Sequence, residues 1–68
     1  MDAALLEYEM KKKHISAKAL SDYIGIDRSS FSKKMRGISE FKLSEIQKIC
    51  ECLSIDNPQP IFFSNEVS

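Results

Sequence analysis

The segment that follows Asp27 carries the side chains with the clearest capacity for chemistry. Its polar residues include Arg28, Ser29, Ser32 and Lys33. On a helix, residues four apart lie on the same side, so these side chains would form one polar surface. Guanidinium and ammonium groups on such a surface can donate hydrogen bonds to guanine O6 and N7 or to phosphate oxygens. The pattern therefore favours a helix that contacts an anionic partner.

Catalytic and metal chemistry have little support in this sequence. The serines of the same segment lack the carboxylate–histidine arrangement that activates a nucleophile. His14 is the single histidine, and Cys50 and Cys52 are the only cysteines. Two residues apart on a helix, these thiols diverge by roughly 200°, which does not suit a shared zinc ion. We therefore predict free thiols in a reducing compartment, no cofactor, no metal and no enzymatic activity.

The charges are distributed unevenly although the net charge is zero. Residues 1–10 carry three acids and no base, which gives a charge of −3. Residues 11–36 carry eight bases and two acids, a charge of +6, and residues 37–68 return to −3. A basic middle between acidic ends predicts one surface suited to phosphate. The neutral total, taken alone, argues against nucleic acid.

The apolar spacing is helical almost throughout and predicts an all-α fold. Ser16 and Asp27 are good N-caps for two short helices, and Gly25 between them can adopt the positive φ that ends the first. The expected helices cover about 2–13, 17–24, 28–36 and 43–53, followed by a short turn through residues 61–63. Two short helices joined by a turn that contains glycine are typical of a helix-turn-helix, with small Ser21 where the helices cross.

Several details of packing can also be predicted. We expect Ile38 and Phe41 to point inward from the loop after Gly37, and Leu43 to continue the apolar stripe of the fourth helix. Lys42 is a poor N-cap for that helix, and Ser44 is the nearest conventional one. Of the two final phenylalanines, at positions 62 and 63, one should cover the core and the other should be exposed.

The length and the termini limit the organisation of the chain. With 68 residues, we expect a single domain over 1–63 and a flexible tail over 64–68. No apolar run approaches the ~20 residues that span a bilayer. The acidic N-terminus lacks the positive start of a secretory signal, so a cytoplasmic protein with no membrane contact is expected.

Residues 15–37, ISAKALSDYIGIDRSSFSKKMRG, resemble the helix-turn-helix of the lambda-repressor-like group, which contains the Cro and phage-repressor (Xre-type) proteins. The resemblance extends over about residues 3–63, because Leu43–Ile46 and Leu53–Ile55 are similar to the family's fourth helix and its exit. It implies a compact five-helix domain, binding to an operator in double-stranded DNA, and often a homodimer.

The resemblance also implies roles for individual positions. The base-reading positions correspond to Arg28, Ser29 and Lys33, and the backbone-contacting positions to Ser16, Ala17, Ser32, Arg36 and Lys42. Ala17 stands where the family commonly has a glutamine that steadies both a phosphate and the first base-reading residue. Met10 and Met35 stand where the family often buries an Arg–Glu pair, so an apolar contact between them is expected.

These observations lead to one main functional hypothesis and one alternative. The main hypothesis is a sequence-specific transcriptional regulator, a repressor or Cro-like protein from a phage or mobile bacterial element, that binds a palindromic operator as a dimer. The alternative is a protein-interaction module of the same fold, either an antitoxin or a modulator of a partner repressor. The neutral net charge and the acidic ends favour this alternative.

Overall fold

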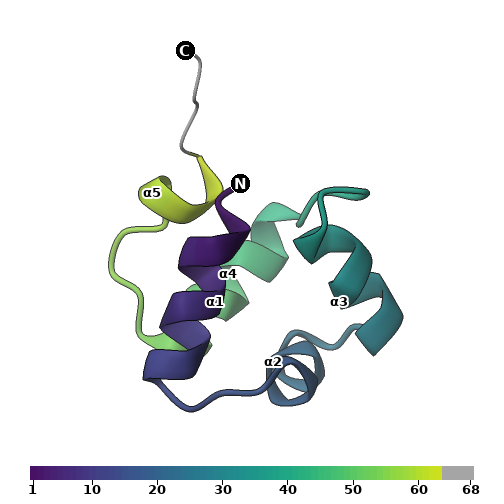
Figure 1. Cartoon of the computed structure of the whole chain (residues 1–68), viewed down its shortest axis with the longest axis horizontal. Helices are drawn as coiled ribbons and strands as arrows, with labels where there is room; N and C mark the ends of the chain where they lie inside the picture. The colour runs from purple at the N-terminus through teal and green to yellow at the C-terminus, as the bar shows by residue number, and fades with distance from the viewer. Residues whose placement is uncertain (64–68) are drawn as a thin grey trace.

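The computed structural model describes residues 1–63 and is all-helical over that range. Predicted tail residues 64–68 lie outside the described residues. The helices are α1 (Ala3–Lys12), α2 (Ala17–Ile24), α3 (Arg28–Met35), α4 (Leu43–Leu53) and α5 (Gln59–Phe62). Figure 1 shows α1 in front of α4, with α5 beside the start of α1 and the pair α2–α3 at the other side of the molecule. The expected five-helix fold is confirmed.

Side-chain caps define where the first three helices begin. Asp2 accepts a hydrogen bond from the Leu5 N–H, and Ser16 accepts one from the Ala19 N–H, both at 3.0 Å. Asp27 does the same for Ser29. Each cap satisfies a backbone donor that the first turn of a helix leaves without an intrahelical acceptor.

Gly25 ends α2 in the left-handed conformation, with φ of 89°. The N–H groups of Gly25 and Ile26 both donate to the Ser21 carbonyl, at 2.9 and 3.0 Å. This turn connects α2 to α3 within three residues, and Ile26 packs back against the core. The short connection to α3 that the sequence predicts is therefore formed by a glycine in the conformation that glycine adopts most easily.

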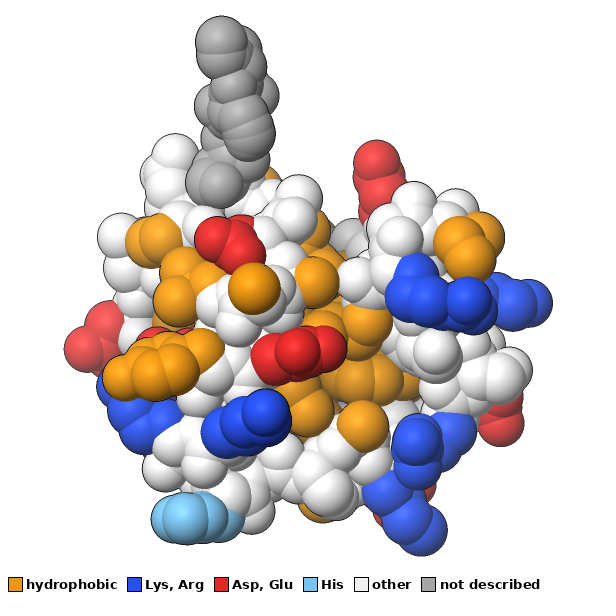
Figure 2. All heavy atoms as spheres, viewed as in Figure 1, with side chains coloured by type: hydrophobic (Ala, Val, Ile, Leu, Met, Phe, Trp, Pro, Cys, Tyr) orange, Lys and Arg blue, Asp and Glu red, His pale blue; other side chains and the backbone are white. Residues whose placement is uncertain are grey.

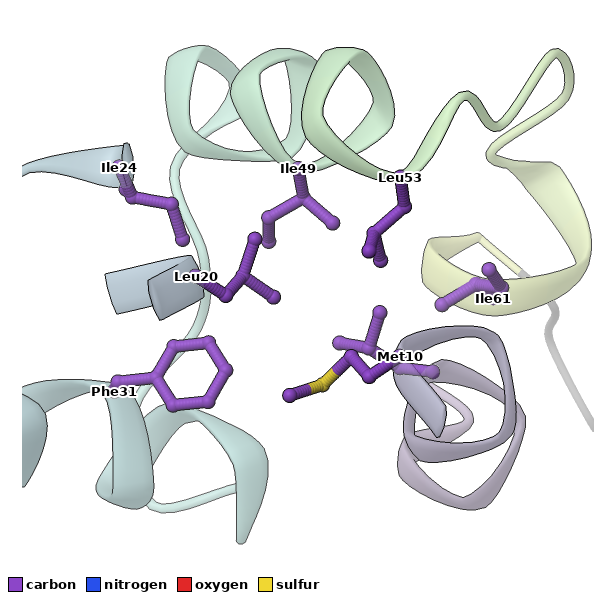
Figure 3. Packing of buried hydrophobic residues seen from close by; sticks show 8 residues of the cluster. Met10, Leu20, Ile24, Phe31, Ile49, Leu53 and Ile61 are labelled. Atoms are coloured by element: carbon purple, nitrogen blue, oxygen red, sulfur yellow. The ribbon is translucent and has the colours of Figure 1, made fainter. Parts of the chain in front are cut away.

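One core joins all five helices. Figure 3 shows side chains from separate helices meeting in its centre. Its fully or nearly fully buried members are Leu6, Met10, Leu20, Ile24, Phe31, Ile49, Leu53 and Ile61. Ser21 is completely buried where α2 packs, and its hydroxyl donates to the Lys18 carbonyl at 3.0 Å. Ser21 is therefore small, buried and satisfied in its hydrogen bonding, which suits the close approach of helices that the sequence predicts at this position.

Hydrogen bonds at the two ends of α1 join this helix to α5 and α4. The Asp2 N–H donates to the Ile61 carbonyl at 2.7 Å, which joins the start of α1 to α5. At the other end of α1, the Lys13 ammonium donates to the Leu53 carbonyl, one of the carbonyls that the last turn of α4 leaves open. Although α5 is short, Ile61 anchors it in the core.

Two packing expectations were wrong. Ile38 and Leu43 are each 64% exposed, so neither contributes to the core. Ile38 follows the left-handed turn at Gly37, and Leu43 is the first residue of α4, where the helix has not yet reached the interior. The N-cap of α4 is Lys42, which agrees with the expected start of the helix at residue 43, although Ser44 is the nearest conventional cap. Glu45, inside the first turn, accepts a hydrogen bond from the Lys42 N–H at 2.8 Å, as the glutamate of a capping box does.

Other packing expectations are confirmed. Phe41 and Phe62 pack against the core, and their rings meet edge to face with centroids 6.0 Å apart. Phe63 is about half exposed. Met10 is buried and Met35 packs against the same cluster, while a direct contact between the two methionines stays a prediction.

Candidate nucleic-acid interface

The outer side of α3 carries the polar side chains that the sequence singled out. Arg28, Ser29, Ser32 and Lys33 are all exposed, whereas Phe31 on the opposite side is 2% exposed and holds the helix to the core. Figure 2 shows Lys and Arg side chains gathered over α3 at the right of the molecule. The helix thus has one anchored side and one side available to a partner.

The cations on this surface are not neutralised within the described part of the chain. Among residues 1–63, no carboxylate lies within ion-pair distance of Arg28, Lys33 or Arg36. By contrast, the neighbouring Lys18 of α2 pairs with Asp22 at 3.1 Å. An unneutralised guanidinium on an ordered helix is available to bind an anion without first breaking an internal contact.

Asp27 caps α3 and also organises Ser29. Its carboxylate accepts a hydrogen bond from the Ser29 N–H at 3.0 Å. Hydrogen bonds from the Ser29 hydroxyl and backbone lower the pKa of Asp27, with a smaller contribution from the charge of Lys33. The exposed Ser29 hydroxyl can either donate or accept a hydrogen bond, so it can meet both kinds of polar group on a base edge.

The start of α2 supplies a second polar region. Ser16 is exposed and caps the helix, and Ala17 is partly buried against the core. The Ser16 side chain occupies the Ala19 N–H, which leaves the N–H groups at the first two helical positions without an intrahelical acceptor. Such N–H groups, at the positive end of the helix dipole, suit a phosphate oxygen.

The remaining predicted contacts, Arg36 and Lys42, flank the loop between α3 and α4. Arg36 is the exposed C-cap of α3, and Lys42 is the exposed N-cap of α4. The predicted residues are therefore distributed over the start of α2, the outer side of α3 and the two ends of this loop.

Sequence reasoning missed an ion pair next to this loop. The Lys34 ammonium lies 2.7 Å from Glu45 Oε1, and the two side chains are only 13% and 11% exposed. Burial favours the protonated form of Glu45, but hydrogen bonds from Lys34 and from the Lys42 N–H outweigh it and leave the pKa of the carboxyl lowered. The two residues are eleven positions apart in the sequence, so no helical spacing rule could have indicated their contact.

The pKa of Asp27 leads to a prediction about acid stability. Because the pKa is lower in the folded chain than its ordinary 3.8, the charged carboxylate stabilises the fold above that value. This contribution is lost as the pH falls through the folded pKa. Asp27→Asn keeps a good N-cap but cannot titrate. We expect Asp27→Asn to be less stable than wild type at pH 7, and the difference to shrink towards pH 3, in urea unfolding followed by circular dichroism. If the stability difference between wild type and Asp27→Asn stays constant from pH 7 to pH 3, the pKa of Asp27 is not lowered by folding.

The side chains that could suggest other chemistry are separated or inert. His14 is exposed, and the pKa values of Cys50 and Cys52 are raised by burial, which keeps both thiols protonated at neutral pH. Within residues 1–63, no group of three or more His, Cys, Asp or Glu side chains is arranged to hold a metal ion. Over the same range, every helix is too short or too polar to cross a bilayer.

Comparison with known proteins agrees with this geometry. No curated protein and no solved structure matches the chain. A family model does match: residues 6–62 fit the Cro/C1-type HTH DNA-binding domain, from the middle of α1 to the end of α5. The match includes α2, the Gly25 turn and α3. The chain belongs to the family of Cro/C1-type helix-turn-helix DNA-binding domains.

Proposed function

We propose that this protein is a sequence-specific transcriptional regulator that places α3 in the major groove of an operator. The observation that carries the proposal is the outer side of α3, where Arg28 and Lys33 are exposed and have no carboxylate partner among residues 1–63. An α-helix fits the major groove, and arginine and lysine suit guanine O6 and N7 there. Ser29 is the third proposed base contact, through its exposed hydroxyl.

Contacts to the DNA backbone would set the orientation of this helix. We assign them to the start of α2 (Ser16 and Ala17), to Ser32 and to the loop ends at Arg36 and Lys42. Ala17 lacks the amide group of a glutamine, so at this position the proposed contact is made by the backbone N–H alone. Contacts of this kind make binding steeply dependent on salt.

The proposed biological context is that of a phage or mobile-element repressor or Cro-like protein in the bacterial cytoplasm. A domain of this size reads only a few base pairs, so two copies on a palindromic operator would supply the necessary specificity. The half-exposed Phe63 and the exposed Leu43 offer apolar area for such a homodimer. Repression would follow from occupation of a promoter.

Selection from random duplexes tests the proposal. The purified protein is incubated with a random library at low salt, and bound duplexes are recovered and sequenced over several rounds. We expect enrichment of a motif with two inverted half-sites about 10 base pairs apart, centre to centre. Sedimentation of the protein, free and on the enriched duplex, then gives the stoichiometry. A library that shows no enrichment at low salt would overturn the proposal.

A second candidate is a protein-interaction module, an antitoxin or a modulator of a partner repressor. The observation in its favour is a cavity of about 560 Å³ between the end of α3, the following loop and α5, with Met35, Phe41, Ile46 and Phe62 among its lining. The lining mixes these apolar side chains with polar and charged ones, and the net charge of the chain is zero, which suits a protein partner better than a polyanion. Failure of the selection experiment would favour this candidate.

A further inference from the structure

Glu45 contacts two elements that carry proposed DNA contacts. Its Oε1 atom accepts a hydrogen bond from the Lys34 ammonium at 2.7 Å and another from the Lys42 N–H at 2.8 Å. Lys34 belongs to the last turn of α3, and Lys42 is the N-cap of α4. One carboxylate therefore spans the loop of residues 36–42 by binding the chain just before it and at its end.

Packing and one ion pair together fix the geometry of this region: Met35 and Phe41 lie against the core, and the Phe41 ring meets the Phe31 ring edge to face. A helix of eight residues is not stable alone, so its orientation depends on what holds its ends. Phe31 anchors the middle of α3, whereas Lys34 is the side chain that ties its C-terminal turn to α4 by an ion pair. The Lys34 ammonium also lies over the Phe41 ring, 5.9 Å from its centroid, so the same cation contacts the loop itself.

We propose that Glu45 is a positioning residue for DNA binding. It does not touch DNA; it holds the end of α3 and the start of α4 at a set separation, so that Arg36 and Lys42 meet the backbone while Arg28 and Lys33 lie in the groove. The inference rests on the proposed function. It predicts that a negatively charged residue strengthens the binding of a negatively charged ligand.

The direction in which DNA affinity changes when this negative charge is removed distinguishes positioning from long-range electrostatics. Glu45→Gln and Glu40→Gln each remove one negative charge from the same region, and Glu40 is an exposed loop residue. Long-range attraction alone would make both variants bind DNA more tightly. Positioning predicts that Glu45→Gln binds the selected operator about tenfold more weakly than wild type, because the neutral amide holds the Lys34 ammonium less strongly than the carboxylate does. Glu40→Gln should bind as well as wild type or better.

Affinity is measured by fluorescence anisotropy with protein shown by circular dichroism to be folded at the assay temperature. A merely structural role would change the urea midpoint of Glu45→Gln and leave the operator affinity of the folded fraction like that of Glu40→Gln. That result would overturn the proposal. Lys34→Met, which keeps the Glu45 cap on Lys42, should also weaken operator binding.

Amide hydrogen exchange tests the positioning itself, without DNA. We expect Lys34→Met to speed exchange in the last turn of α3 and to leave the Lys42 amide protected. Glu45→Ala should speed exchange at both places, with α1 unchanged. Exchange that rises equally in all helices, or at neither place, would contradict the proposal. If wild type selects no operator while these local changes occur, the DNA-binding function fails and the positioning by Glu45 stands.

Discussion

Phe31→Ala is expected to remove most of the stability of the domain. The ring is 2% exposed, packs in the core and meets the Phe41 ring edge to face with centroids 5.8 Å apart. Truncating a buried phenylalanine leaves a cavity and costs about 3–5 kcal/mol. A single core in a domain of this size rarely supplies more than about that amount. We therefore expect a large unfolded fraction at 25 °C, with no DNA binding beyond that of the residual folded protein.

The measurement is a urea titration followed by circular dichroism at 222 nm. Tyr8→Ala is the matched control, because it also removes an aromatic ring but from a side chain that is 57% exposed. Its free energy of unfolding should change by less than about 1 kcal/mol. A Phe31→Ala midpoint as high as that of the control would show that α3 is held by something other than its apolar side.

Arg28→Ala is expected to give the largest loss of sequence preference. Arg28 is the first residue of α3, is exposed, and pairs with no carboxylate among residues 1–63. A bidentate arginine–guanine contact contributes roughly 1–3 kcal/mol of discrimination against the wrong base. The selected operator should therefore bind about 5- to 150-fold more weakly, and the motif should become degenerate at one position in each half-site. Stability should change little, since the side chain is exposed.

Three further variants show whether the loss comes from base reading or from charge. Arg28→Lys keeps the charge but not the planar fork, so it should retain the salt dependence and lose much of the preference. Lys33→Ala should relax a different position of the motif. Lys48→Ala removes an exposed charge on α4, outside the proposed contacts, and should leave the motif intact. If Arg28→Ala selects the same motif as wild type with the same affinity, Arg28 is not a base-reading residue.

Most of the fold could be predicted because its signals are local. Ser16 and Asp27 cap helices through hydrogen bonds to residues only two or three positions away, and Gly25 adopts a conformation that other residues avoid. Such interactions depend on residue type and spacing, which the sequence contains directly. The polar side of α3 followed from the same helical spacing once Phe31 was assigned to the core.

The interactions that could not be predicted join residues distant in the sequence. Leu43 and Ile46 have the same apolar character, yet Leu43 is exposed and Ile46 is buried, because the direction in which α4 enters the core decides which part of the stripe meets other helices. The roles of Lys34 and Glu45 likewise depend on how α3 and α4 approach each other. The helix propensities and spacing within each segment do not specify how two helices pack against each other.

The sequence by itself therefore determined the helices, the turn at Gly25 and the exposed polar surface that includes Arg28, through interactions that span a single helical turn. Tertiary structure alone decided the orientation of that surface, through the burial of Phe31 and the Lys34–Glu45 ion pair. The physical reason is that a short helix acquires its stability and its direction from packing and from partners elsewhere in the chain, and not from its own residues.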